Sequence, residues 1–207
     1  YNDLDNEVVN LFRELRNKRL RESLEEQLYL TPFSRSEFYD AYEDTDDQVE
    51  KARRMIIRAQ MGFGSAGATK GKTGFRMAGG RQKNYEIVLW DQYPNRLSMV
   101  AERLKQVMIE NQDASKVISY YDSKNTFFFV DPPYIHSTRT ANVTAYRYEM
   151  TDDEHIALVE QLLHLKGKVI LCGYNHEIYS SRLSEWSRFT KSTQASGNRG
   201  GVTREEV

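Results

Sequence analysis

Two kinds of hydrophobic spacing alternate along this chain. Apolar residues three or four positions apart recur in the first third and at intervals later, as in helices with one buried face. Short continuous apolar runs, such as residues 126–130 and 168–172, are typical of buried strands. The pattern predicts helices at residues 5–16, 19–28, 34–41, 47–60, 95–104, 114–120, 152–165 and 176–186, and strands at 107–109, 126–130, 168–172, 188–192 and 202–207.

The order of these elements predicts the fold class. Strands that alternate with helices indicate an α/β fold with a doubly wound, mostly parallel sheet. Residues 126–130 are expected to form a buried central strand, and the last two strands a hairpin that adds an antiparallel edge. The helix-rich segment and glycine-rich stretch before residue 86 form an insertion in this interpretation.

Composition narrows the class of protein without identifying it. The 207 residues, 39% of them hydrophobic, are enough for one main core. No apolar run reaches the length of about 18 residues that a membrane span needs, so no membrane association is expected. Cys172 is the single cysteine, which excludes an internal disulfide and suits a reducing cytoplasm. The four histidines lack the spacing of metal ligands, so no metal is expected.

A short polar motif follows the apolar run at residues 126–130. Asp131, Pro132, Pro133 and Tyr134 are expected to end the strand, because proline lacks the N–H that a central strand donates. The carboxyl edge of a parallel sheet is where such folds bind ligands. There Asp131 and a backbone carbonyl beside the prolines could accept hydrogen bonds from the two N–H groups of a planar amine, while Tyr134 stacks on the ring that carries the amine. The alternative is a turn that only closes the strand.

Positive charge is concentrated in one segment although the net charge is only −1. Residues 51–83 contain nine Lys or Arg, no acid and seven glycines, a composition that suits contact with a phosphate backbone. The candidate DNA-binding residues there are Lys70, Lys72, Arg76, Arg81 and Lys83. Arg139 and Arg199 are further candidates for phosphate contacts. The alternative for the segment is a solvated linker.

Several motifs in order, taken together, resemble a known family. Besides residues 131–134 they are Tyr-Asn-Asp-Leu-Asp-Asn at the start, Trp90 with Pro-Asn-Arg-Leu at 94–97, Thr-Ala-Asn-Val-Thr-Ala-Tyr at 140–146, Val-Ile-Leu-Cys-Gly-Tyr-Asn-His at 169–176 and Gly-Asn-Arg-Gly-Gly at 197–201. With these motifs the chain resembles the Dam-type adenine-specific DNA methyltransferases. That family transfers a methyl group from S-adenosylmethionine to the N6 amine of adenine.

The resemblance implies roles for several residues. Asp131, Pro132, Pro133 and Tyr134 would be catalytic and would act on an adenine flipped out of double-stranded DNA. S-adenosylmethionine would be bound by Asp3, Asp113 and Asp131, although Asp3 and Asp113 could instead be helix caps.

The resemblance also implies a domain organisation and a setting. Residues 1–13 and 86–207 would form the catalytic domain, and residues 14–85 the target-recognition region. A bacterial or phage enzyme in the cytoplasm, with a cognate restriction endonuclease as a functional partner, would fit.

One departure from the family leaves alternatives open. The family opens with a segment that contains a basic residue and a Phe-x-Gly-x-Gly-type loop, which wraps the methionine part of the cofactor. This chain contains no such segment. We therefore expect that an N-terminal part is missing. The alternatives are a methyltransferase for another planar amine, in RNA, cytosine N4 or glutamine, or a catalytically silent DNA-binding subunit.

Overall fold

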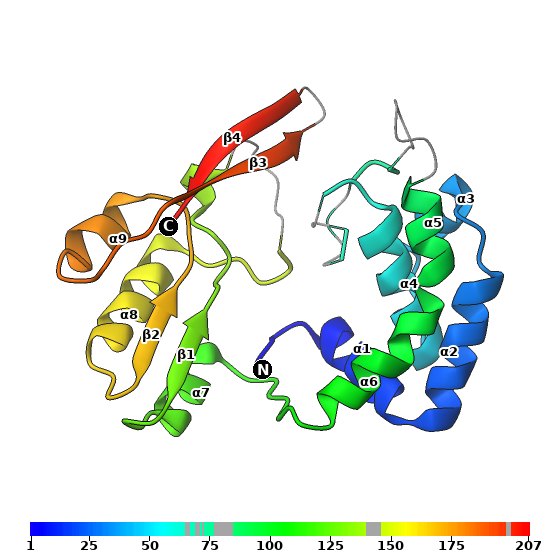
Figure 1. The fold of residues 1–207 in the computed structure, drawn as a ribbon, viewed down its shortest axis with the longest axis horizontal. Coiled ribbons are helices and arrows are strands. Elements are labelled where there is room, and N and C mark those ends of the chain that lie inside the picture. Colours follow the sequence, from blue (N-terminus) through cyan, green and yellow to red (C-terminus); the bar gives the residue numbers. More distant parts are fainter. Residues whose placement is uncertain (65–66, 69–70, 72, 77–84, 140–145, 198–199) are drawn as a thin grey trace. The chain divides into compact units, whose positions relative to one another are not determined.

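The computed structural model describes residues 1–64, 67–68, 71, 73–76, 85–139, 146–197 and 200–207 (Figure 1). The chain forms two compact units. The first contains Tyr1–Asn111 together with Tyr146 and Arg147, and the second contains the rest of the chain from Gln112 onward. The predicted domain boundaries at 13/14 and 85/86 fall inside the first unit. A division by function need not follow compactness, so those boundaries stay a prediction.

The described part of the first unit is helical (Figure 1). Its core is made by leucine, isoleucine, methionine and phenylalanine side chains, of which Leu24, Leu28, Phe38, Ile57 and Met61 are wholly buried. Polar side chains begin the helices: Asp5 accepts the Glu7 N–H, and Asp47 accepts the Glu50 N–H. The elements are α1 Asn6–Arg16, α2 Lys18–Leu30, α3 Arg35–Asp40, α4 Gln48–Met61, α5 Tyr85–Gln92, the 3₁₀ turn η1 Pro94–Arg96, and α6 Leu97–Leu104.

Helix α5 is missing from the sequence-based prediction. Its apolar residues Ile87, Val88, Leu89 and Trp90 are consecutive, so they do not show the three-to-four spacing that marks a helix. Tertiary contacts hold it instead, because Trp90 is buried in the core of the first unit and its indole N–H donates to the Thr31 carbonyl at 2.8 Å.

Arginines of α4 lie within the basic segment but bind partners inside the first unit. Arg53 pairs with Glu50 at 2.6 Å and with Glu37 at 3.0 Å, and Arg54 shares Glu50 at 2.6 Å. Arg58 is only 2% exposed and pairs with Glu7. These side chains stabilise the helical unit, so in the described residues the segment's charge is partly neutralised by Glu50 of the same helix and by acids of α1 and α3.

The second unit has a β-α-β arrangement at its centre (Figure 1). Strands β1 Phe127–Val130 and β2 Lys168–Leu171 are parallel, and Phe128 lies opposite Val169. Phe128, Val130, Val169 and Leu171 pack against buried side chains of two helices, α7 Ala114–Tyr121 and α8 Asp152–Leu163. The remaining elements are the 3₁₀ turn η2 His136–Thr138, α9 Glu177–Arg182, and the antiparallel hairpin β3 Lys191–Gly197 and β4 Gly200–Glu206.

The structure corrects part of the predicted sheet. Residues 107–109 form no strand, and Glu110 makes only an isolated parallel bridge with Asn2. Strand β1 is not buried on both faces, since Phe127 is 59% and Phe129 66% exposed. The hairpin β3–β4 forms a two-stranded sheet of its own within the described residues, and it meets the parallel pair only where Val207, directly after β4, exchanges two backbone hydrogen bonds with Gly173, two residues after β2. The fold is therefore mixed helix and sheet with a small parallel sheet, and a doubly wound sheet with an inserted domain stays a prediction.

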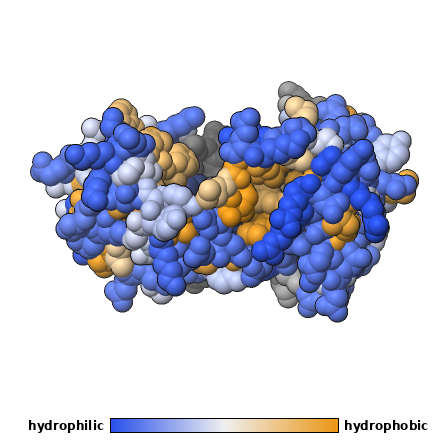
Figure 2. Space-filling model, turned by 90° about the horizontal axis from the view of Figure 1, so that it is seen from below, coloured by the Kyte–Doolittle hydropathy of each residue, from blue (hydrophilic) through white to orange (hydrophobic). Residues whose placement is uncertain are grey.

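Figure 2 shows polar side chains over most of one face, interrupted by smaller hydrophobic areas. Among the residues that the structure describes, no helix combines the length and hydrophobicity needed to cross a membrane.

Candidate active site

The predicted motif lies directly after β1, as its prolines require. The Val130 carbonyl, the last in the strand, accepts the Cys172 N–H at 2.9 Å, so β1 and the chain after β2 stay paired up to the motif. Asp131 follows and is exposed, while Pro132 is buried. The Asp131 carboxylate therefore lies at the carboxyl end of the parallel strand pair, which is the position predicted for it.

Tyr134 is held by two contacts, one from its ring to the segment after β2 and one from its backbone carbonyl to Arg139. Its ring meets Tyr174, which follows β2, in an edge-to-face arrangement with centroids 4.7 Å apart and planes at 78°. Its backbone carbonyl accepts a hydrogen bond from Arg139. The tyrosine is half-buried, so it is both anchored and partly accessible.

The turn after Tyr134 is fixed by a buried apolar anchor. Ile135 is 1% exposed, and its carbonyl accepts the Thr138 hydroxyl at 2.6 Å. On the same turn, the Ser137 hydroxyl lies 3.3 Å from Nε2 of His176. Nδ1 of His176 accepts the Ile178 N–H at 3.2 Å, so His176 caps α9. The motif and the turn after it thus each contact the segment after β2, through Tyr134 and Ser137.

A buried histidine supports the same part of the second unit. His155 on α8 is fully buried, and its Nδ1 lies 2.8 Å from the Tyr179 hydroxyl. The Tyr179 ring fills the space beside Gly173, where an added Cβ would lie 2.9 Å from a ring carbon. Burial lowers the pKa of His155 below its ordinary value of 6.5 and raises the pKa of Tyr179 to about 12. The pair is therefore uncharged at neutral pH.

This burial predicts a pH dependence of stability. Folded His155 binds fewer protons than the unfolded chain below pH 6.5, so the free energy of unfolding should fall as pH drops below 6.5 and be insensitive to this group well above it. Nearby Asp152 and Glu154 oppose the shift, and Arg139 and His176 reinforce it. Urea unfolding at pH 7.5 and 5.5 measures the loss. It should shrink in His155→Gln and persist in His164→Gln, whose histidine is exposed; equal losses in both variants would contradict the assignment.

Asp3 lies in the first unit, and its carboxylate already has partners. Its Oδ1 accepts the Asp5 N–H at 2.8 Å, and its Oδ2 accepts the Tyr1 hydroxyl at 2.7 Å. The alternative role as the cap of α1 is wrong, because Asp5 is the residue that caps this helix. Cofactor binding by Asp3 stays a prediction.

Asp113 lies in the second unit at the start of α7. Its side chain accepts the N–H groups of Ser115 at 3.0 Å and Lys116 at 3.4 Å, so it caps the helix. The capping alternative is thus confirmed, and a contact with the cofactor stays a prediction.

Most of the predicted DNA-binding residues lie outside the described part of the chain. They are Lys70, Lys72, Arg81, Lys83 and Arg199. Arg76 is described and half-buried, and its backbone N–H donates to the Met61 carbonyl at 2.7 Å. This bond and the bridge between Gly62 and Phe75 attach the chain at Arg76 to the end of α4.

Arg139 lies in the described part of the chain, and its side chain is bound to other residues of the second unit. Its guanidinium makes two 2.8 Å bonds to Glu149, in addition to the bond with Tyr134. Sequence reasoning missed Glu149, Tyr174 and Tyr179 as residues of this site, and it assigned His155 no role beyond excluding a metal. They come from elements after the motif, and no local spacing connects them with Asp131.

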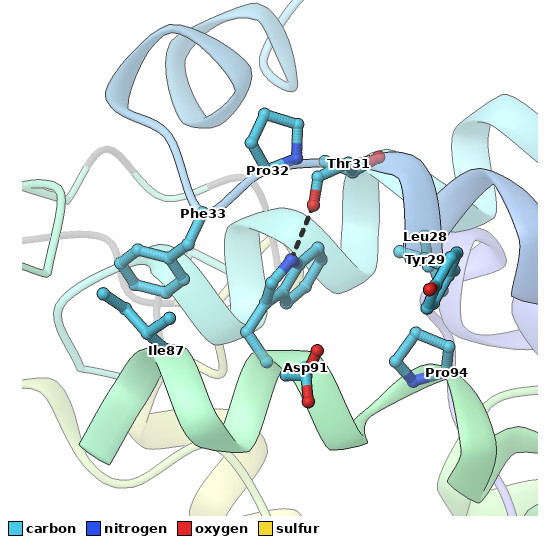
Figure 3. Close-up of a pocket in the computed structure, with 9 residues that line it drawn as sticks. Leu28, Tyr29, Thr31, Pro32, Phe33, Ile87, Asp91 and Pro94 are labelled. Atoms are coloured by element: carbon cyan, nitrogen blue, oxygen red, sulfur yellow. Dashed lines mark hydrogen bonds between the residues drawn. The ribbon is translucent and has the colours of Figure 1, made fainter. Parts of the chain in front are cut away.

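A pocket of about 200 Å³ lies in the first unit between the end of α2 and helix α5 (Figure 3). Phe33, Ile87 and Pro94 give it an apolar lining, and the bond from Trp90 to Thr31 closes one side. None of the predicted catalytic or cofactor-binding residues lines it. In the described residues, no group of three or more His, Cys, Asp or Glu has an arrangement that could hold a metal ion.

Comparison with known proteins adds a family match. The family model described as D12 class N6 adenine-specific DNA methyltransferase matches residues 1–194. A type II methyltransferase of Methanocaldococcus jannaschii, M.MjaIII, is 29% identical over 168 residues, which are 77% of this chain and 55% of that protein. A second, M1.LlaDCHI of Lactococcus lactis subsp. cremoris, is 27% identical over 159 residues, 72% of this chain and 54% of that protein. The chain therefore spans about half the length of these curated relatives.

Proposed function

Because the chain belongs to the D12 class N6 adenine-specific DNA methyltransferase family, we propose that it contributes the catalytic motif of an enzyme that methylates the N6 amine of adenine in double-stranded DNA. One observation carries the proposal. Asp131 is exposed at the carboxyl end of β1, next to an anchored and partly accessible Tyr134. A carboxylate and a ring at one strand end suit a flat base that carries an amine.

The chemistry follows from what these residues can accept and hold. The lone pair of an exocyclic amine is delocalised into the ring, which makes it a weak nucleophile. In the proposed mechanism the Asp131 carboxylate and the Pro132 carbonyl accept hydrogen bonds from the two N–H groups of the amine. These bonds direct the nitrogen lone pair toward the methyl group of the donor, while the Tyr134 ring stacks on the flipped base. As the new N–C bond forms, the bond between the methyl group and the donor sulfur would break and leave a neutral thioether, and the proton lost by the amine would pass to water. No covalent bond to the protein is needed.

S-adenosylmethionine is the proposed methyl donor, and its sulfonium supplies the electrophilic methyl group when bound. The donor set of this chain fits part of such a ligand. A carboxylate has about four lone-pair sites, and the two hydrogen bonds at Asp3 leave it able to accept ribose hydroxyls. Asp131 is exposed and suits the cationic amino group of the methionine part. Asp113 is proposed to approach the adenine ring of S-adenosylmethionine, although its carboxylate also caps α7.

The names of the two relatives support one part of the proposed setting, the link with restriction and modification. Both are type II methyltransferases by name. We propose that this enzyme acts on DNA in the cytoplasm of a bacterium or a phage-infected host, and that a restriction endonuclease is its functional partner.

The first experiment is direct. The complete gene product is incubated with S-adenosylmethionine and unmethylated DNA, and the nucleosides are analysed by mass spectrometry. N6-methyladenine would support reaction, substrate and donor together. Methylation of cytosine, RNA or a glutamine side chain instead would change the substrate assignment. DNA binding without methylation would favour a silent subunit.

Neutralising the basic segment should weaken DNA binding. With Lys72, Arg76 and Arg81 replaced by Gln, DNA affinity is expected to fall, and the slope of log K against log salt to decrease by up to about 2.7 if all three contact phosphates. Titration of labelled DNA at several salt concentrations measures both quantities.

A matched control separates a local effect from a change in net charge. Lys116, Lys124 and Lys166 are exposed in the second unit, and the last two precede β1 and β2, at the end of the strands opposite Asp131. Replacing these three by Gln should leave the salt slope unchanged. Equal effects of the two triple variants would argue against a role of the basic segment in recognition.

A further inference from the structure

Arg139 connects two segments of the second unit. Its Nη1 and Nη2 donate to Oε1 and Oε2 of Glu149, each at 2.8 Å, and Nη2 also donates to the Tyr134 carbonyl. The arginine side chain is 11% exposed, and that of Glu149 25%. A planar guanidinium that matches both oxygens of a carboxylate is a strong and directional pair. This geometry defines where Arg139 lies.

Both ends of this connection are attached to rigid elements. Glu149 lies two residues before Thr151, which begins α8 in a capping box with Glu154. Helix α8 packs on the parallel sheet through Leu158 and Leu162. At the other end, the ring of Tyr134 contacts Tyr174. The Tyr134 carbonyl is therefore held by Arg139, which is itself fixed by Glu149 just before α8, and the Tyr134 ring is held by the segment after β2.

We propose that Arg139 and Glu149 are positioning residues, which hold Tyr134 where its ring can stack on the target base, and that Arg139 does not bind a DNA phosphate. The proposal rests on the proposed function, because that reaction gives Tyr134 its role. A phosphate contact would require Arg139 to leave a well-shielded carboxylate, and Glu149 itself would repel the phosphate. The two roles predict different results.

Two substitutions in the complete protein distinguish them. Arg139→Gln and Glu149→Gln should each lower the single-turnover methylation rate, by as much as about a hundredfold if Tyr134 shifts by an ångström. DNA affinity and its salt dependence should stay as in the wild type. Arg139→Lys should restore little of the rate, because lysine keeps the charge but lacks the two-pronged geometry.

The opposite outcome is equally specific. A phosphate contact predicts that Arg139→Gln reduces the salt slope by about one and that Glu149→Gln, which frees the cation, tightens DNA binding. Either result would overturn the proposal. Arg182→Gln is the matched control, since Arg182 pairs with Glu160 at 3.6 Å on the exposed surface of the same unit. It should change neither rate nor binding.

A measurement without activity tests the connection separately. In Arg139→Gln, hydrogen exchange of the backbone amides at residues 134–139 should become faster, while exchange in α8 stays slow. Unchanged exchange at residues 134–139 would refute the positioning role even in an active enzyme. A wild type that does not methylate adenine would refute the proposed function, and the exchange result would still decide whether Arg139 holds Tyr134.

Discussion

Methylation by the complete gene product should fall about 10²- to 10³-fold when Asp131 is replaced by alanine. The substitution removes the carboxylate that accepts an amine hydrogen, and this interaction strengthens as the new bond forms. DNA affinity should be unchanged or slightly tighter, because the exposed carboxylate repels phosphates. Single-turnover methylation and equilibrium DNA binding measure the two effects separately.

Two further variants sharpen this experiment. Asp131→Asn keeps one acceptor oxygen and the side-chain shape, so its rate should lie between those of the wild type and Asp131→Ala. Asp153→Ala removes an exposed carboxylate at the start of α8, which has no part in the proposed chemistry, and should leave the rate unchanged. A wild-type rate in Asp131→Ala would exclude the proposed mechanism.

Replacing Arg58 by methionine should lower the free energy of unfolding by about 3–5 kcal/mol. The guanidinium is 2% exposed; it donates to the Ala41 carbonyl at 2.6 Å and the Gly67 carbonyl at 3.2 Å, and it pairs with Glu7. Methionine fills much of the volume but leaves the two carbonyls without this donor, and Glu7 keeps only its ion pair with Arg147 at 2.8 Å. Urea unfolding followed by circular dichroism measures the loss.

Lys18→Met is the control for the removal of one positive charge. Lys18 and Glu22 form an exposed pair, with side chains 79% and 58% exposed, so its loss should barely move the unfolding midpoint. A similarly small effect of Arg58→Met would mean that the buried pair with Glu7 does not stabilise the first unit.

Local sequence was sufficient for the helices with one apolar face and for the position of residues 131–134, the proposed catalytic motif. Helices α1, α2 and α4 were predicted to within two residues at each end, because their apolar spacing and capping residues act within a turn or two. Asp131 lies at the end of β1 for a similar reason, since the prolines after it prevent continuation of the strand. These features depend on interactions between residues close in the chain.

Tertiary structure decided which charges and apolar residues find partners. Arg58 and Glu7 are 51 residues apart in the chain, and Arg139 pairs with Glu149 ten residues further on, so local sequence did not show that either arginine has an acidic partner in its own unit. Likewise, the apolar run of β1 predicted burial on both faces, although only the face of Phe128 and Val130 meets helices in its own unit. Local spacing records which residues share a face, whereas burial and pairing depend on segments that folding brings together.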